Sequence, residues 1–95
     1  MGKGEDKMTI NDAMQKMAEA IGDDAEWPPN YLKSELCSAR LLDAMPNICI
    51  ERGGEALELW HIQTNCGPWT GHADRKTAVF LAALAWKAIE RPEDL

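Results

Sequence analysis

Three residues with metal-binding side chains follow one another as His61, Cys66 and His72, with Asp74 or Cys49 available as a fourth ligand. Zinc in proteins takes nitrogen and sulfur ligands of this kind in a tetrahedral arrangement. Structural zinc sites generally contain a closely spaced ligand pair such as Cys-x2-Cys, and this sequence has none. Because buried thiols are common in metal-free proteins, the sequence favours a protein without a metal or other cofactor.

The same residues could serve a thiol enzyme. A cysteine becomes nucleophilic when an imidazole or a helix N-terminus stabilises its thiolate, so Cys66 could pair with His61 or His72. No motif for an oxyanion hole or for a known cysteine hydrolase accompanies them. A metal- or thiol-dependent small enzyme using these three residues is therefore the alternative, and a protein without catalytic activity is the favoured interpretation.

Acidic residues gather toward the N-terminal half of the chain, where Asp23, Asp24 and Glu26 precede a proline pair. They lack the alternating oxygen ligands and central glycine of an EF-hand loop, so we expect a solvated acidic turn. The net charge is −6, and the local basic cluster is Arg75-Lys76. Nucleic-acid binding needs a clustered basic surface, so we expect no direct nucleic-acid binding and instead a protein partner with a basic surface.

The four tryptophans are a second sign of binding. Trp60 and Trp86 fall in expected secondary structure and are assigned to the core, whereas Trp27 and Trp69 fall in loops beside prolines. Tryptophan is enriched at binding surfaces because it combines a large apolar area with a polar N–H group. The loop tryptophans either fold back as lids on the core or stand exposed as anchors for a partner, and the sequence leaves both alternatives open.

The clearest secondary-structure signal is a helix over residues 74–90. Asp74 is its expected N-cap, the run Ala78 to Trp86 is entirely apolar, and Lys87 followed by Pro92 marks its end. A helix that is apolar on nearly every side must be covered on more than one face. We therefore expect the rest of a small domain, or a second copy of the chain, to enclose it.

Two shorter helices precede this one. The first begins at the cap Thr9 and ends at Gly22, with apolar residues at helical spacing between them. The second spans 34–45, from the cap Ser34 to the residue before Pro46. Its expected buried face consists of Leu36, Ala39, Leu42 and Met45, widened by Leu41 and Cys37.

A β-hairpin is expected over about 47–63, around the glycine pair Gly53-Gly54. Of its two registers we favour the one that turns Trp60 and Ile62 inward, because they carry more apolar surface. An isolated hairpin is marginal in water, so a third strand is expected. Its candidate sources are Tyr31 to Lys33, Trp69 to Gly71, where Pro68 would confine it to a sheet edge, or a partner chain.

These elements predict an α+β fold of order α-α-β-β-α, in which a small antiparallel sheet packs against two or three helices. Its 95 residues allow one domain, at 9–91, between a disordered lead-in at 1–8 and a tail at 92–95. The apolar runs are too short for a membrane span, and the start lacks the apolar stretch of a secretory signal. The three cysteines have no disulfide-like spacing, which also favours the cytoplasm.

A run of features between residues 31 and 90 fits a known pattern: Tyr31, Ala39 followed by Leu41-Leu42, the strand Leu59-Trp60-His61-Ile62, and the helix from Thr77 to Leu84. In these features the chain resembles the phage ABA sandwich domain family, small phage proteins of unknown activity. It departs from that family at Arg40, where an aromatic residue is usual. The resemblance implies a helix and sheet sandwich and a phage or prophage origin, and it supplies no active site.

The resulting prediction is a small phage or prophage accessory protein that acts by protein-protein binding in the cytoplasm of the host cell. Its expected action is to occlude a basic surface on a host or phage protein, for example as an inhibitor of a host defence complex. Small residues on the C-terminal helix also make a homodimer a candidate: Ala78, Ala82 and Ala85. The predicted partner-binding residues are Asp23, Asp24, Glu26, Trp27 and Trp69, with no catalytic, metal or cofactor residue.

Overall fold

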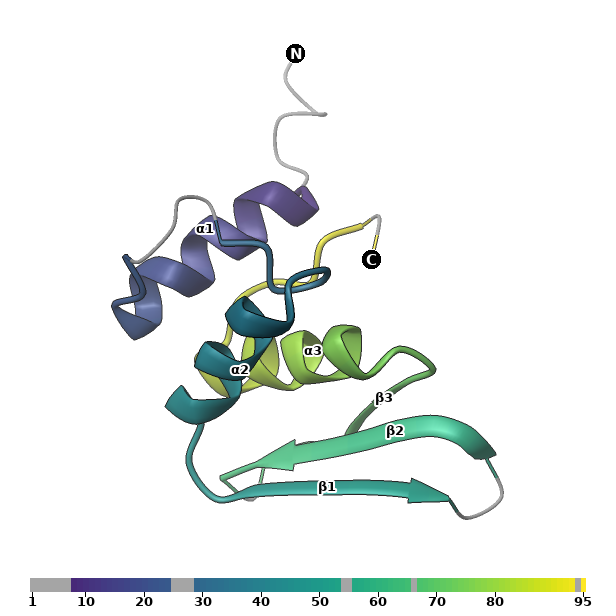
Figure 1. The fold of residues 1–95 in the computed structure, drawn as a ribbon. Coiled ribbons are helices and arrows are strands. Elements are labelled where there is room, and N and C mark those ends of the chain that lie inside the picture. The colour runs from purple at the N-terminus through teal and green to yellow at the C-terminus, as the bar shows by residue number, and fades with distance from the viewer. Residues whose placement is uncertain (1–7, 25–28, 54–55, 66, 94) are drawn as a thin grey trace.

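The computed structural model describes residues 8–24, 29–53, 56–65, 67–93 and 95, with the backbone alone for 52, 53 and 56–58. These residues form an α+β fold of three helices and a three-stranded antiparallel sheet, which confirms the predicted class (Figure 1). In chain order the elements are α1 (Ile10–Ile21), α2 (Glu35–Ala44), β1 (Ile48–Gly53), β2 (Ala56–Thr64), β3 (Thr70–His72) and α3 (Arg75–Lys87).

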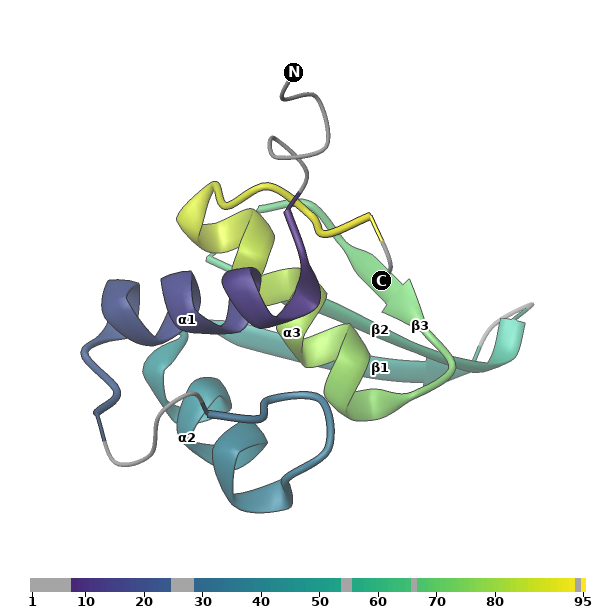
Figure 2. The same ribbon diagram turned by 90° about the horizontal axis from the view of Figure 1, so that it is seen from above.

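The three helices lie on one face of the sheet (Figures 1 and 2). Helix α3 packs directly on β2 and β3, and α2 and α1 pack against α3 from its other sides. The apolar run from Ala78 to Leu84 is buried by these contacts. The prediction that this helix is covered on more than one face is therefore confirmed, and elements of the same chain provide the cover.

Helix α3 begins at the predicted cap and ends earlier than predicted. The side chain of Asp74 accepts the N–H of Thr77, as an N-cap residue does. Ala88 has a left-handed backbone with φ of 56°, so the helix stops before it and not at Glu90. The N–H of Ile89 then donates to the carbonyl of Leu84 at 2.9 Å, which satisfies one of the carbonyl groups at the helix end.

Helix α1 has the predicted caps. Thr9 accepts the N–H of Asp12 at 3.1 Å, and Gly22 ends the helix with a left-handed φ of 73°. The residues that α1 buries are Ala13, Met14, Met17 and Ala18. They share one side of the helix and face α3, which accounts for the spacing seen in the sequence.

Helix α2 is capped by Ser34 as predicted, and its predicted buried face is right for Cys37, Leu41 and Met45 and wrong for two residues. Leu36 is 66% exposed and Ala39 is exposed, although both were assigned to the core. The buried side consists of Cys37, Ser38 and Leu41. Ser38 turns inward and takes a place that an apolar residue was expected to fill, so the helix is rotated relative to the prediction.

The sheet has the order β1-β2-β3, and its inward residues are those favoured by apolar area. Ile62 of β2 is fully buried and pairs with Ile50 on one side and Thr70 on the other. Trp60 is half-buried against the core. Strand β3 provides the third strand from the second candidate source, and it lies at an edge, as Pro68 required.

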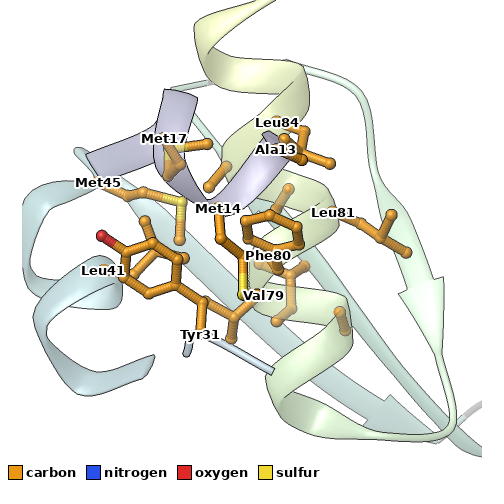
Figure 3. Packing of buried hydrophobic residues seen from close by; sticks show 14 of the residues in the cluster. Ala13, Met14, Met17, Tyr31, Leu41, Met45, Val79, Phe80, Leu81 and Leu84 are labelled. Carbon is orange, nitrogen blue, oxygen red and sulfur yellow. The ribbon is translucent and has the colours of Figure 1, made fainter. Parts of the chain in front are cut away.

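The first candidate strand contributes to the core instead. Tyr31 is fully buried, and its ring stacks on Phe80 with centroids 5.9 Å apart (Figure 3). Leu41 of α2 and Met14 of α1 belong to the same buried cluster. The centre of the core is thus the space between the three helices, and the sheet closes it through Ile62.

The two ends of the described chain are packed together. The N–H of Glu93 donates to the carbonyl of Met8 at 3.3 Å, Pro92 is buried, and Leu95 packs against the core. The ordered structure thus includes Met8, assigned to the lead-in, and residues assigned to the tail. The rest of the predicted lead-in, 1–7, lies outside the described residues.

Candidate functional site

A groove lies between β3 and the C-terminal half of α3, and we call it the Trp69 groove. It has a volume of about 390 Å³. Its floor is apolar and includes the nearly buried side chains of Leu81 and Leu84, with Ile89 beside them. In Figure 3, Leu81 points away from the central core toward β3. Trp69 and Arg91 also line the groove, so its wall combines an indole with a cation.

Trp69 is exposed, which argues against the first of the two alternatives left open for it, a lid on the core. Its side chain is 45% exposed, so it does not act as a lid on the core. It directly precedes β3, an edge strand whose neighbour in the sheet is β2. The backbone of an edge strand can pair with an added strand, and Thr70 and Gly71 of this strand line the groove. The groove therefore offers an apolar floor, an aromatic wall and a strand edge at one place.

A smaller cavity of about 130 Å³ adjoins the groove. Pro68 and Trp86 line it, and Ala85 lines both recesses. Ala85 is exposed on the helix surface where the two recesses border each other. The ammonium of Lys87 lies 4.2 Å from the ring centroid of Trp86. Trp86, predicted as a core residue, is half-buried and contributes to this surface.

At the other end of the molecule, Asp23 is turned inward. Its carboxylate accepts the hydroxyl of Tyr31 at 2.8 Å and the guanidinium of Arg40 at 3.2 Å. Its side chain is only 6% exposed. Burial and the hydrogen bond to Asp23 raise the pKa of Tyr31 above its usual value, so the hydroxyl remains a donor. Asp23 thus holds the loop before α2 to the end of α1.

The other acidic candidates are less constrained. Asp24 is exposed and, with Asp43 of α2, lines a second cavity of about 390 Å³ at the C-terminal ends of α1 and α2. Glu26 and Trp27 lie outside the described residues. The C-terminal end of α1 and strand β3 lie on opposite sides of the molecule in both views (Figures 1 and 2). The structure therefore does not bring Asp24 and Trp69 onto one surface.

The histidines are separated by the sheet register. His61 pairs with Gly71 while His72 pairs with Trp60, so the two imidazoles project from opposite faces of the sheet. Nδ1 of His72 also accepts the N–H of Asp74 at 2.9 Å, which leaves the proton of a neutral ring on Nε2. Cys66 lies outside the described residues, and within those residues no three metal-binding side chains come together. This arrangement disfavours a shared ion.

Sequence reasoning missed most of the groove. Ile89 and Arg91 were taken only as the end of a helix, and Ala85 as a small residue in a helix contact. Ile89 is a large apolar residue just before the charged pair Glu90-Arg91, and this was the available signal. Its proximity to Trp69 depends on the pairing of β3 with β2, which the spacing of the sequence does not specify.

Comparison of the chain with family models, with curated proteins and with solved structures found no match. The helices of the described residues are also all shorter or more polar than a membrane crossing requires. The function must therefore be argued from the geometry of the groove and the charges around it.

Proposed function

We propose that this chain is a protein-binding module that takes an extended segment of another protein into the Trp69 groove. The segment lies beside the open edge of β3 and places an apolar side chain on the floor formed by Leu81 and Leu84. The observation that carries the proposal is the exposure of Trp69 at the wall of an apolar groove.

Two physical arguments support a peptide segment as the occupant. Strand addition at a sheet edge supplies main-chain hydrogen bonds that any sequence can make, and an adjacent pocket supplies selectivity. A large aromatic side chain next to a desolvated pocket is the type of residue that dominates binding energy at interfaces. Strand β3 provides such a sheet edge over a short stretch, Thr70–His72. Trp69 provides the large aromatic side chain.

The partner is proposed to have a basic surface overall. The net charge of −6 and the exposed Asp24 and Asp43 would attract such a protein at long range. Because Asp24 and Trp69 lie at opposite ends, the acidic end acts in this proposal by steering and the groove by contact. The proposal includes neither nucleic acid nor a cofactor.

The resemblance to phage proteins extends the proposal to a phage or prophage protein that inhibits a host defence complex in the host cytoplasm. This extension is supported by the resemblance and the acidity alone. A homodimer is also proposed, but it cannot form through the alanine surface of α3 that the sequence suggested. Ala78 and Ala82 are buried within the chain, which leaves Ala85 as the exposed alanine of the three.

The test is affinity capture of partners from a bacterial lysate, followed by binding of the captured protein after purification. Three proteins are compared: the wild type, Trp69→Ala, and the matched control Leu36→Ala, which removes an apolar side chain that is 66% exposed on α2. We expect the partner to bind the wild type and the control and to be lost with Trp69→Ala. Equal binding by all three would exclude the groove as the binding site.

A further inference from the structure

Among the described residues that line the Trp69 groove and the adjoining cavity, the one charged side chain is a cation, whereas the chain as a whole is acidic. Arg91 lines the groove, and Lys87 lies over the ring of Trp86, which lines the adjoining cavity. No acidic side chain appears among the described residues that line either recess. Glu90 and Glu93 are exposed nearby in the chain without lining them. The groove lining is therefore cationic through Arg91 alone, in a chain with a net charge of −6.

Arg91 is placed to bind an anion. One of its terminal N–H groups donates to the backbone oxygen of Leu95 at 3.0 Å, and a guanidinium carries further donors in the same plane. Its side chain belongs to an exposed residue at the groove, so those donors can reach a ligand. Arginine matches a carboxylate with two parallel hydrogen bonds, which gives the pair both strength and orientation.

We propose that the segment bound in the Trp69 groove carries a carboxylate close to a bulky apolar side chain. The apolar side chain lies on Leu81 and Leu84, the carboxylate meets Arg91, and Lys87 strengthens the local field. This inference rests on the proposed function and adds the chemistry of the segment. A partner that is basic overall meets it with a local acidic residue or a chain end.

The probe is a library of random linear peptides, selected against the wild-type protein and counter-selected against Trp69→Ala. Recovered peptides are synthesised, each with a variant whose carboxylates are replaced by amides, and dissociation constants are measured by calorimetry. The protein variants are Arg91→Gln, Arg91→Lys and the distant control Lys16→Gln on α1, whose side chain is exposed. Thermal unfolding of each variant establishes that it folds.

We expect acidic-apolar peptides, with binding weakened about tenfold by Arg91→Gln and by the amide peptide, since a charge-assisted pair is lost in each case. The two changes together should cost little more than either one, because they remove the same interaction. Arg91→Lys should recover part of the affinity, and Lys16→Gln should have no effect.

Other outcomes separate the inference from the proposed function. Peptides that depend on Trp69 but are neutral or basic, with no effect of Arg91→Gln, overturn the inference and leave the groove as the binding site. If no peptide depends on Trp69, both fail. Self-association of the protein through this surface, lost in Trp69→Ala, would assign the groove to a second copy and also overturn the inference.

Discussion

At the α1–α2 end of the molecule the charged residue Asp23 is turned inward, whereas at the β3–α3 end the apolar residue Trp69 is turned outward. Charged side chains are normally exposed to water and large apolar ones are normally buried, so both residues are exceptions. Asp23 is compensated by Tyr31 and Arg40 within the chain. For the indole of Trp69, which is 45% exposed, the chain provides only partial cover.

This difference separates structural from functional residues. A buried charge with close hydrogen-bond partners has found its stabilisation inside the protein, so its removal should damage the fold. An apolar side chain left at a groove gains stabilisation only when something else covers it, so its removal should damage binding. The predictions below test this division from the largest expected effect to the smallest.

Replacing Asp23 should cause the largest loss of stability. Asp23→Ala leaves the hydroxyl of Tyr31 and the guanidinium of Arg40 without their shared acceptor, which should cost about 3 kcal/mol of unfolding free energy. The measurement is urea denaturation followed by tryptophan fluorescence. The neighbouring Asp24→Ala serves as control and should stay within about 0.5 kcal/mol of the wild type. Equal effects of the two changes would remove the distinction.

Replacing Trp69 should affect binding and not folding. For a tryptophan hot spot, Trp69→Ala should weaken the partner or peptide about 30-fold or more, or about 2 kcal/mol. Its unfolding free energy should change by less than about 1 kcal/mol, because the side chain is partly exposed. Calorimetric titration and denaturation on the same preparation measure both quantities. A large loss of stability with unchanged binding would place Trp69 with the structural residues.

Removing the hydroxyl of Tyr31 should have an intermediate effect. Tyr31→Phe keeps the ring stacked on Phe80 and loses the hydrogen bond to Asp23, at a cost of about 1 kcal/mol near neutral pH. Burial and that hydrogen bond raise the pKa of Tyr31 in the folded protein. An unfolded tyrosine ionises near pH 10, so the contribution is complete below about pH 10 and declines as the pH rises further.

Alkaline denaturation of both proteins checks this. The stability advantage of the wild type over Tyr31→Phe should shrink above about pH 10, where the unfolded tyrosine gives up its proton first. An advantage that is constant to higher pH would show that the hydroxyl titrates alike in the folded and unfolded states, contrary to the buried hydrogen bond described above.

The smallest effect is expected at Asp74, the N-cap of α3, against which α1, α2 and β3 all pack. Hydrogen bonds from the side chain and backbone of Thr77 hold the pKa of Asp74 below its usual value. Its stabilising charge is therefore present above about pH 4 and is lost as the pH falls through the lower folded value. Asp74→Asn keeps a capping oxygen, so it should cost only about 0.5 kcal/mol at neutral pH.

The test is to measure the unfolding free energy of the wild type and of Asp74→Asn at a series of decreasing pH values. The difference between the wild type and Asp74→Asn should close as the pH is lowered, because the wild-type carboxyl then becomes neutral as well. A difference that persists in acid would mean that geometry and not charge distinguishes the two caps.

The features that the sequence predicted well depend on neighbours along the chain. The caps Thr9, Ser34 and Asp74 act on N–H groups a turn away, and α3 could be identified from one unbroken apolar run. These are local interactions, and their spacing is visible in the sequence. The inward register of Trp60 and Ile62 also followed, because one face of the hairpin carries more apolar area.

The features that the sequence did not predict depend on long-range contacts. The ion pair of Asp23 with Arg40 joins α2 to the second residue after the end of α1, and nothing local marks it. The rotation of α2 that exposes Leu36 follows from which side meets α3. The groove likewise requires Trp69 and Ile89 to meet across β3 and α3. Such contacts depend on the assembled packing of helices and sheet.

The hydrogen bond between the backbones of Met8 and Glu93 closes the described chain almost into a loop. Because the two ends lie close together, a circularly permuted chain, in which the elements follow one another in a different order, should adopt the same fold. A short linker across this junction, with new chain ends between β1 and β2, would keep the three helices and the groove in place. The new chain ends would lie on the adjacent strands β1 and β2. The domain could then be inserted into another protein, which would be joined to it at these two strands.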